Sequence, residues 1–212
     1  ARSARLVACG LLLARLHARV LGRHLHDLAE DARRENGREV DVDLRIGDVA
    51  PDVEGHAEQA FAAALELAPA FHIARYRLAH VYMSSGRQSE AVATILAIPS
   101  DAPLPQRDKL YIDAAKAFFQ FNLASAIAVY RELLELYPYE VEARQFLAEV
   151  YFHNYDEKTA VDELKVLALQ EPENEFIWGS MGTYLVLSGR LDEAQAPLET
   201  YLKLAAEKAH PL

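Results

Sequence analysis

Residues 141–172 read VEARQFLAEVYFHNYDEKTAVDELKVLALQEP, and this stretch decides the fold. Its second half places Leu164 four residues after Ala160, and Leu167 three residues later again. Offsets of four and three put these side chains on one stripe of an α-helix. The stretch ends on Pro172, and proline stops a helix because it lacks an N–H and clashes with the preceding turn. We therefore expect a helix that ends before this proline.

The same pattern recurs along most of the chain. The phased alanines, spaced by 34, 35, 34 and 34 residues, are Ala57, Ala91, Ala126, Ala160 and Ala194. A bulky apolar residue follows each of them after four positions, namely Phe61, Ile95, Tyr130, Leu164 and Leu198. Prolines repeat with the same slip of one residue, at Pro69, Pro103, Pro138 and Pro172. A period of about 34 residues indicates a repeat protein.

A partner helix is predicted before each phased alanine except the first. Apolar residues at helical spacing predict these helices over 73–84, 108–120, 141–153 and 176–187. Turns between the paired helices hold Gly86 and Gly189 at equivalent places, with Asn122 and Asp156 near the corresponding turns. Such residues are easily accommodated where a helix ends and the chain reverses.

These repeats resemble the tetratricopeptide repeat, a 34-residue helix-turn-helix with W-x2-L-G-x2-Y, then A-x3-F, then P. The fullest matches are LAHVY at 78–82, LAEVY at 147–151 and WGSMG at 178–182. A small residue occupies the place of the pattern's glycine in each repeat, at Ala79, Ala114, Ala148 and Gly182. The resemblance implies an all-α, right-handed superhelical solenoid of about four and a half repeats over 56–208, with an N-terminal helical leader.

Several positions depart from the pattern. The third repeat has Asp113 where the pattern has Leu, and Ala117 where it has Tyr, so we expect its packing to be the least regular. Pro99 should end the outer helix of the second repeat near Ile98 and leave a longer connector. Pro197 lies within the last outer helix, where we expect it to kink the chain or to delay the helix start.

The leader differs in charge from the rest of the chain. Residues 1–38 carry eight arginines against four acids, whereas residues 39–212 carry 14 basic and 28 acidic side chains. Apolar residues near one stripe predict a basic amphipathic helix within 1–37, before a linker loop at 38–55. This helix either caps the first hairpin, or binds an acidic partner, the array itself or an anionic membrane surface.

Composition bounds the class of protein. A chain of 212 residues with 51% hydrophobic residues can bury a core, and nine glycines and nine prolines are too few for a loop-rich β protein. The single cysteine, Cys9, cannot form an internal disulfide, so we expect a reducing, cytoplasmic location. The longest apolar run near the start, 6–14, falls short of the roughly 20 residues of a membrane helix. The acidic net charge of −10 makes nucleic acid a poor partner.

The sequence carries no motif for catalysis or for a cofactor. Its eight histidines show no metal-ligand spacing such as H-E-x-x-H, and it lacks a glycine-rich phosphate loop and a G-x-S-x-G elbow. Acidic pairs at 162–163 and 192–193 lie near predicted helix N-termini, where carboxylates complement the helix dipole. We therefore expect no metal, no cofactor and no enzymatic activity.

The candidate functional surface is the concave groove, which the resemblance assigns to the first helix of each hairpin. Its predicted lining residues are Tyr76, His80, Met83, Tyr111, Phe118, Phe119, Gln145, Glu149, Phe152, His153, Phe176 and Thr183. Aromatic residues and methionine are typical of surfaces that recognise proteins, because they bury much area with few rotors. The alternative for about half of these side chains is packing between repeats.

The expected partner is a protein or a peptide. Arrays that capture a C-terminal carboxylate place Lys, Asn and Arg along the groove, whereas Asp108, Gln145 and Glu149 stand at matching places here, so an apolar or basic peptide is favoured. Residues 107–112 and 126–134 resemble repeat arrays of bacterial signalling proteins, which implies, as an alternative, a regulatory or sensory region of a kinase or transcription regulator. Another alternative is a homo-oligomer in which the basic leader docks on another copy's acidic repeats.

Overall fold

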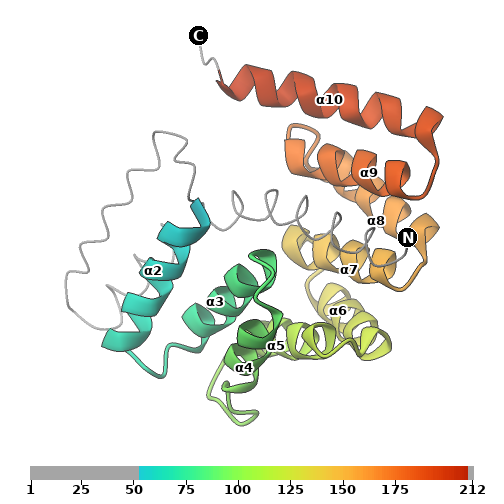
Figure 1. Cartoon of the computed structure of the whole chain (residues 1–212). Coiled ribbons are helices and arrows are strands. Elements are labelled where there is room, and N and C mark those ends of the chain that lie inside the picture. Colours follow the sequence, from blue (N-terminus) through green and yellow to red (C-terminus); the bar gives the residue numbers. More distant parts are fainter. Residues whose placement is uncertain (1–52, 210–212) are drawn as a thin grey trace. The chain divides into compact units, whose positions relative to one another are not determined.

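The computed structural model describes residues 53–209, and every regular element in this part of the chain is an α-helix (Figure 1). The helices are α2 (Val53–Leu67), α3 (His72–Ser84), α4 (Gln88–Leu96), α5 (Gln106–Phe119), α6 (Leu123–Leu136), α7 (Val141–His153), α8 (Glu157–Gln170), α9 (Glu175–Leu187) and α10 (Leu191–Ala209). The leader expected at 1–37 lies outside the described residues, as does most of the linker expected at 38–55, whose last three residues belong to α2. The predicted all-α class is confirmed for the part that the structure describes.

The described residues divide into two compact units, 53–103 and 104–209. In the first unit, α3 packs against both α2 and α4. Its core consists of Ala57 and Phe61 from α2 with Ala74, Leu78 and Val81 from α3. The second helix of one repeat therefore packs on the first helix of the next, as the repeat pattern requires.

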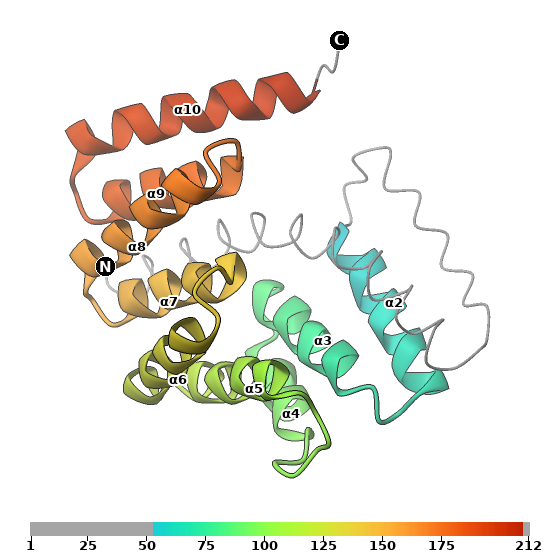
Figure 2. The ribbon, with the colours of Figure 1, turned by 180° about the vertical axis from the view of Figure 1, so that it is seen from behind.

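The unit 104–209 is built from three helical hairpins, which pair α5 with α6, α7 with α8, and α9 with α10. Neighbouring hairpins stack through α6 against α7 and through α8 against α9 (Figures 1 and 2). The fully buried Tyr130 of α6 fills one such joint, because its ring stacks on Phe146 of α7 with 5.9 Å between centroids. Within the α7–α8 hairpin, the Arg144 guanidinium donates a hydrogen bond to the Glu163 carboxylate at 2.6 Å.

The five phased alanines lie in the core of the array. All five are buried, with exposed fractions of 0% or 1%. The bulky residues four positions later are also buried in four of the five repeats, at Phe61, Ile95, Tyr130 and Leu164, whereas Leu198 is half-buried. A methyl group at the alanine position lets the second helix approach its neighbours, while the bulky residue fills the adjoining space. The helical register predicted from the 34-residue period is confirmed.

The small residue of each first helix marks the close approach within a hairpin. Ala79, Ala114 and Ala148 are fully buried, and Gly182 takes the equivalent place in α9. A Cβ atom on Gly182 would lie 2.5 Å from Cδ2 and 2.6 Å from Cγ of Leu198 in α10. A methyl group at this position would therefore force the Leu198 side chain to shift, so glycine lets α10 lie close to α9 in the last hairpin.

The four hairpins from α3 to α10 share one turn geometry. The second residue after the first helix has a positive φ in each of them: Gly86 (76°), Phe121 (58°), Tyr155 (61°) and Gly189 (78°). The next residue then donates its N–H to the carbonyl five positions earlier, as Asn122 does to Ala117 at 2.9 Å. This hydrogen bond provides a donor for a carbonyl in the last turn of the helix, which has no partner within the helix. Glycine adopts a positive φ freely, whereas an aromatic residue does so at a steric cost.

The second helices begin in two different ways. After the turns with an aromatic residue, the side chains of Asn122 and Asp156 accept the backbone N–H three residues later, at 3.3 and 3.1 Å. After the turns with glycine, Arg87 and Arg190 stand at this place and each pairs with a glutamate three residues later, as Arg87 does with Glu90. Asn and Asp are preferred caps because they bond the free N–H groups of the first turn.

The structure agrees with the prediction made from Pro99 and differs from the one made from Pro197 about where the helix starts. The outer helix of the second repeat ends at Leu96, close to the expected position, and the longer connector runs to Pro105, the residue before α5. Pro197 lies inside α10, which begins at Leu191, so the expected delay of the helix start is wrong. The helix continues past the proline because its fixed φ is helical, and the loss is one backbone hydrogen bond.

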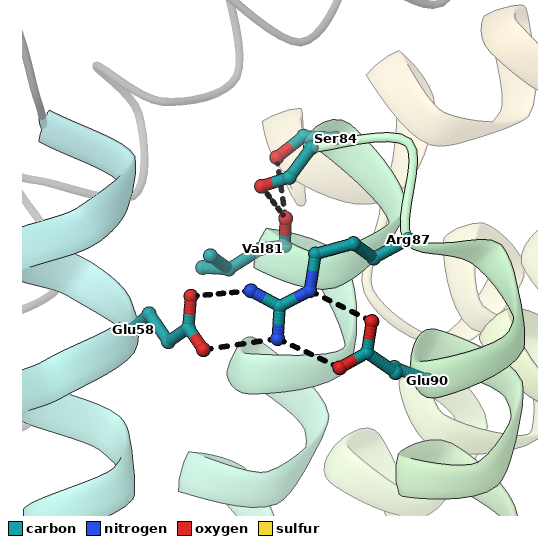
Figure 3. A network of polar contacts seen from close by, with 6 residues as sticks. Glu58, Val81, Ser84, Arg87 and Glu90 are labelled. Atoms are coloured by element: carbon teal, nitrogen blue, oxygen red, sulfur yellow. Dashed lines mark hydrogen bonds and ion pairs between the residues drawn. The ribbon is translucent and has the colours of Figure 1, made fainter.

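Arg87 joins α2 to the α3–α4 hairpin (Figure 3). Its Nη1 and Nη2 donate hydrogen bonds to the Glu58 carboxylate of α2 at 2.7 and 3.0 Å. Its Nε and Nη2 donate to the Glu90 carboxylate of α4 at 2.8 and 2.9 Å. Its Cζ also lies 4.1 Å from the centroid of the Tyr82 ring in α3. A single guanidinium group thus contacts three helices, and we call this group of residues the Arg87 cluster.

Candidate partner-binding surface

The predicted groove residues lie on the first helices of the hairpins and differ in accessibility. The buried ones are Tyr76, Tyr111, Phe119, Phe176 and Thr183. The half-buried ones are His80, Met83, Phe118, Gln145, Glu149, Phe152 and His153. Buried side chains pack within the protein, so the half-buried residues are the part of the predicted site that can contribute direct contacts to a partner.

The three predicted residues of α3 belong to the unit 53–103. Tyr76 and His80 pack edge to face, with ring centroids 4.6 Å apart. The Cζ atom of Arg77 lies 5.1 Å from the Tyr76 centroid. Met83 is half-buried one turn further along α3. This part of α3 therefore combines aromatic rings with a flexible apolar side chain.

The largest group of half-buried residues lies on α7, the middle first helix of the unit 104–209. Gln145, Glu149 and Phe152 follow one another at offsets of four and three, so they share one face of the helix. His153 lies beside them, with its Nε2 3.9 Å from the Glu149 carboxylate. The two form an ion pair only when the imidazole carries a proton. Central α7 thus presents an aromatic residue, a histidine, an amide and a carboxylate on one face.

A row of aromatic side chains crosses all three hairpins of this unit. The Phe118 ring of α5 lies 5.4 Å from the His153 ring of α7, and the neighbouring Phe152 ring lies 6.4 Å from His153. Phe152 in turn stacks on Tyr184 of α9, with centroids 4.2 Å apart and planes 10° from parallel. We call Phe118, His153, Phe152 and Tyr184 the aromatic row. Such ring pairs are worth about 0.5–1.5 kcal/mol beyond their buried area, so the row is a rigid feature.

The structure brings Tyr184 into the row, although the sequence did not predict it. Tyr184 is buried, so it contributes to the row through its stack with Phe152 rather than through an accessible ring. Phe119 was predicted to line the groove, but it is 2% exposed and therefore packs within the protein. Tyr111 is also buried, and its hydroxyl donates to the Glu140 carboxylate at 2.9 Å. These two residues hold the helices together within the unit.

Two exposed aromatic residues at the hairpin turns were missed by the sequence analysis. Phe121 is 62% exposed and Tyr155 is 69% exposed. Their backbone N–H groups donate to the carbonyls of Phe118 and Phe152, at 2.9 and 3.1 Å. We call Phe121 and Tyr155 the tip aromatics. The spacing of Gly86, Phe121, Tyr155 and Gly189, by 35, 34 and 34 residues, is the signal that could have found them.

The described residues contain neither a cluster of metal ligands nor a helix that could span a membrane. Within residues 53–209, no group of three or more His, Cys, Asp or Glu side chains is arranged to hold a metal ion. In the same part of the chain, no helix combines the length and the apolar character needed to cross a bilayer. The candidate site of this unit is therefore described by its aromatic side chains and by the charges around them.

Comparison with known proteins identifies a family for part of the chain. Residues 56–117 match the family model of the tetratricopeptide repeat. The match begins at α2 and ends in α5, and the same 34-residue register continues through α10. The described part of the chain therefore resembles a tetratricopeptide repeat array, the fold that the sequence pattern predicted.

Several solved structures are similar to this chain. The protein "MamA 41-end" from Desulfovibrio magneticus RS-1 aligns with a TM-score of 0.50 and 11% identity, over 91% of this chain and 98% of that chain. Another MamA crystal structure has a TM-score of 0.48 and 19% identity, over 91% of this chain and 96% of that chain. YrrB, described as a TPR protein with an unusual peptide-binding site, has a TM-score of 0.46 and 17% identity, over 82% and 91% of the chains. No curated protein matches the sequence.

Proposed function

We propose that this chain is a protein-interaction scaffold that binds a segment of another protein along the aromatic row. The observation that carries the proposal is the line of rings from α5 through α7 to α9, in which Phe118, Phe152 and His153 are half-buried. Half-buried rings held on α5 and α7 lose little conformational freedom on binding, which is the property of residues that dominate interface energies. The stacked helices hold these rings at fixed separations, so the surface is pre-organised.

The charge of the unit favours an apolar or basic partner. Residues 104–209 contain 18 acidic and ten basic side chains. Glu149 lies on the same face of α7 as Phe152 and His153. A partner that carries Lys or Arg beside apolar residues would bury its apolar residues on the rings. Its basic residues would meet the carboxylates around the rings, and this attraction speeds association and sets the orientation of the partner. We expect such binding to weaken as salt is added.

The alternative of a regulatory region in a bacterial signalling protein has less support. The likeness to such arrays rests on residues 107–112 and 126–134. Several of these residues, such as Ile112, Ala126 and Tyr130, are buried in the α5–α6 hairpin. Core residues of this kind are constrained by packing, so their pattern supports the fold and leaves the signalling role as a hypothesis.

The experiment that tests the proposal measures partner binding by surface variants. The full chain captures partners from lysate, and the recovered partner is titrated by calorimetry against Phe118→Ala and against Phe118→Ala with Phe152→Ala. We expect the double variant to bind at least about tenfold more weakly, because central aromatic anchors each contribute on the order of 1 kcal/mol or more. The single variant leaves the Phe152–Tyr184 stack in place, so it separates loss of binding from loss of fold.

The matched control is Leu169→Ala on α8. This leucine is 86% exposed and lies on a second helix, so its truncation removes an apolar side chain away from the aromatic row. Its affinity should equal that of the wild type. If the double variant stays folded by circular dichroism and still binds with unchanged affinity, the aromatic row is not the binding surface.

A further inference from the structure

The aromatic row has a titratable pair of side chains at its centre. His153 lies next to both phenylalanines of the row, with its ring centroid 5.4 Å from that of Phe118 and 6.4 Å from that of Phe152. Glu149 stands one turn earlier on α7, and its carboxylate lies 3.9 Å from Nε2 of His153. Both side chains are half-buried, so a partner can reach them, while water screens their interaction less than that of surface charges. We call these two residues the Glu149–His153 pair.

The helices α6 and α8 bring charged groups to another side of α7. The Cζ atom of Arg131 in α6 lies 5.6 Å from the Tyr151 centroid, and Glu163 of α8 accepts a hydrogen bond from Arg144. Tyr151 and Arg144 are two and nine residues before His153. At about 3.6 residues per turn, these offsets place both on the side of α7 opposite His153. These contacts therefore lie away from the imidazole.

The helices α5 and α9 approach the pair with uncharged rings. Phe118 of α5 contacts the imidazole, and Tyr184 of α9 completes the row. Asp113 and Lys116 are five and two residues before Phe118, so they lie on the far side of α5. From 176 to 187, α9 holds no charged residue and no histidine. Among the described residues, the charge placed against the imidazole is therefore that of Glu149.

We propose that the Glu149–His153 pair is the subsite for an arginine side chain of the partner, which takes the place of the imidazole's proton. The Glu149 carboxylate is neutralised either by protonated His153 or by a guanidinium that lies on the phenylalanine rings. Arginine suits this place because its planar group pairs with a carboxylate and also stacks on aromatic faces. A cation over such a ring gains roughly twofold to fivefold in binding. The excess of 18 acidic over ten basic side chains in the unit 104–209 also favours a cation.

The proton and the arginine compete, because both are held by the same carboxylate. Protonation of His153 weakens the binding of arginine, and bound arginine makes protonation of His153 harder, by the same factor. An imidazole changes its charge between about pH 5 and pH 8. The subsite therefore takes arginine at the upper end of this range and rejects it at the lower end. The aromatic row would release a basic partner as the solution becomes acidic.

This inference rests on the proposed function, since it names the side chain that the row takes from its partner. The two statements can fail separately. A partner that binds the row with an affinity independent of pH would leave the proposed function intact and contradict the subsite. Binding of arginine by the pair, in a chain whose row binds no protein, would contradict the proposed function alone.

The direct test titrates His153 by NMR in the full chain, with N-acetyl-arginine amide as the probe. The imidazole signals, assigned with a His153→Gln variant, are followed from about pH 5 to about pH 8 with and without the probe. With the probe at about ten times its dissociation constant, the midpoint of the His153 titration should fall by about one pH unit. N-acetyl-citrulline amide has nearly the same shape without the charge, and it should leave the midpoint in place.

Two variants locate the effect on the chain. Glu149→Gln removes the carboxylate and keeps the size of the side chain, so it should bind the arginine probe roughly tenfold more weakly. Glu157→Gln is the matched control, because Glu157 is a half-buried glutamate four residues after His153, on the first turn of α8. The control should bind the probe like the wild type. Circular dichroism checks that both variants are folded.

The partner of the row provides a second measurement. Its affinity for the wild type should fall by up to about tenfold per pH unit as His153 takes up its proton. In His153→Gln the affinity should stay constant over the same range, because glutamine does not titrate. An affinity that falls equally in the variant would assign the pH dependence to another group and contradict the inference.

Three results with the probes would also overturn the inference. The first is a His153 titration that the arginine probe does not move, and the second is an equal shift with the citrulline probe. The third is unchanged binding of the arginine probe by folded Glu149→Gln. Should this variant fail to fold, the comparison of the two probes on the wild type decides the question.

Discussion

At the scale of single residues, the four hairpins differ in the residue that takes the positive φ at the turn. All four hold a small residue at the core position where the two helices come close. The four turn residues share a positive φ, but glycine takes it in two turns and an aromatic residue in the other two. The core position within each hairpin holds alanine in three cases and Gly182 in the fourth. These two positions therefore test separately how backbone conformation and side-chain packing contribute to stability.

Replacing Phe121 by glycine should stabilise the protein by about 1 kcal/mol. Glycine adopts the positive φ of this turn without strain, and the exposed phenylalanine ring contributes little burial. Urea denaturation followed by circular dichroism measures the change. Phe121→Ala is the control, because alanine keeps the Cβ atom and should gain much less. A loss of stability in the glycine variant would show that the ring makes a stabilising contact.

Replacing Gly182 by alanine should destabilise the protein by roughly 1–3 kcal/mol, because the new methyl group overlaps the Leu198 side chain of α10. A double-mutant cycle with Leu198→Ala measures the coupling between the two positions. We expect Leu198→Ala to lower the free energy of unfolding less in the Gly182→Ala background than in the wild type. Additive effects would contradict the close approach of α9 and α10.

At the scale of helices, α2 is held to its neighbours by the core and by the Arg87 cluster. The guanidinium donates to Glu58 of α2 and to Glu90 of α4. Hydrogen bonds from Arg87 hold the pKa of the Glu90 carboxyl below its usual range. Arg190 and Glu193 form the same local pair in the last hairpin, and the pKa of Glu193 is lowered in the same way. Through its hydrogen bonds to Glu58, the Arg87 pair also reaches α2.

Replacing Arg87 by glutamine should lower the melting temperature at neutral pH and accelerate amide exchange in α2. Because the folded pKa of Glu90 is lowered, its pairing stabilises the protein above the ordinary glutamate pKa and is lost as pH falls through the folded pKa. The difference between variant and wild type should therefore shrink below about pH 4. Arg190→Gln is the control and should leave exchange in α2 unchanged. A difference that persists at low pH would contradict the ionic role of the cluster.

The sequence predicts whole helices better than the contacts between them. The predicted first helices agree with α3, α5, α7 and α9 to within about two residues, because their limits follow from local apolar spacing and from turn residues. The stack of Phe152 on Tyr184 joins different hairpins, and nothing in the local sequence reveals it. The positive φ of Phe121 was missed for another reason. Glycine and asparagine are the residues expected at a positive φ, so the pattern pointed to the neighbouring Asn122 as the turn residue.

At the scale of the molecule, the repeat makes a surface that no single hairpin has. The unit 104–209 stacks three hairpins, and each contributes one or two rings to the aromatic row. Five of the twelve predicted groove residues are buried, so packing between helices takes up part of the stripe that we propose for recognition. Sequence spacing places a residue on that stripe, but only the packed hairpins decide how deeply it lies.

Site-specific photo-crosslinking tests the central claim most directly. A photoreactive phenylalanine derivative replaces Phe118 in one full-length variant and Tyr139 in another, and each variant is illuminated together with the captured partner. Phe118 belongs to the aromatic row, whereas Tyr139 lies in the exposed loop before α7. We predict a crosslinked partner from position 118 and none from position 139. Crosslinking from position 139 alone, by variants that both remain folded, would contradict the assignment of the aromatic row as the binding surface.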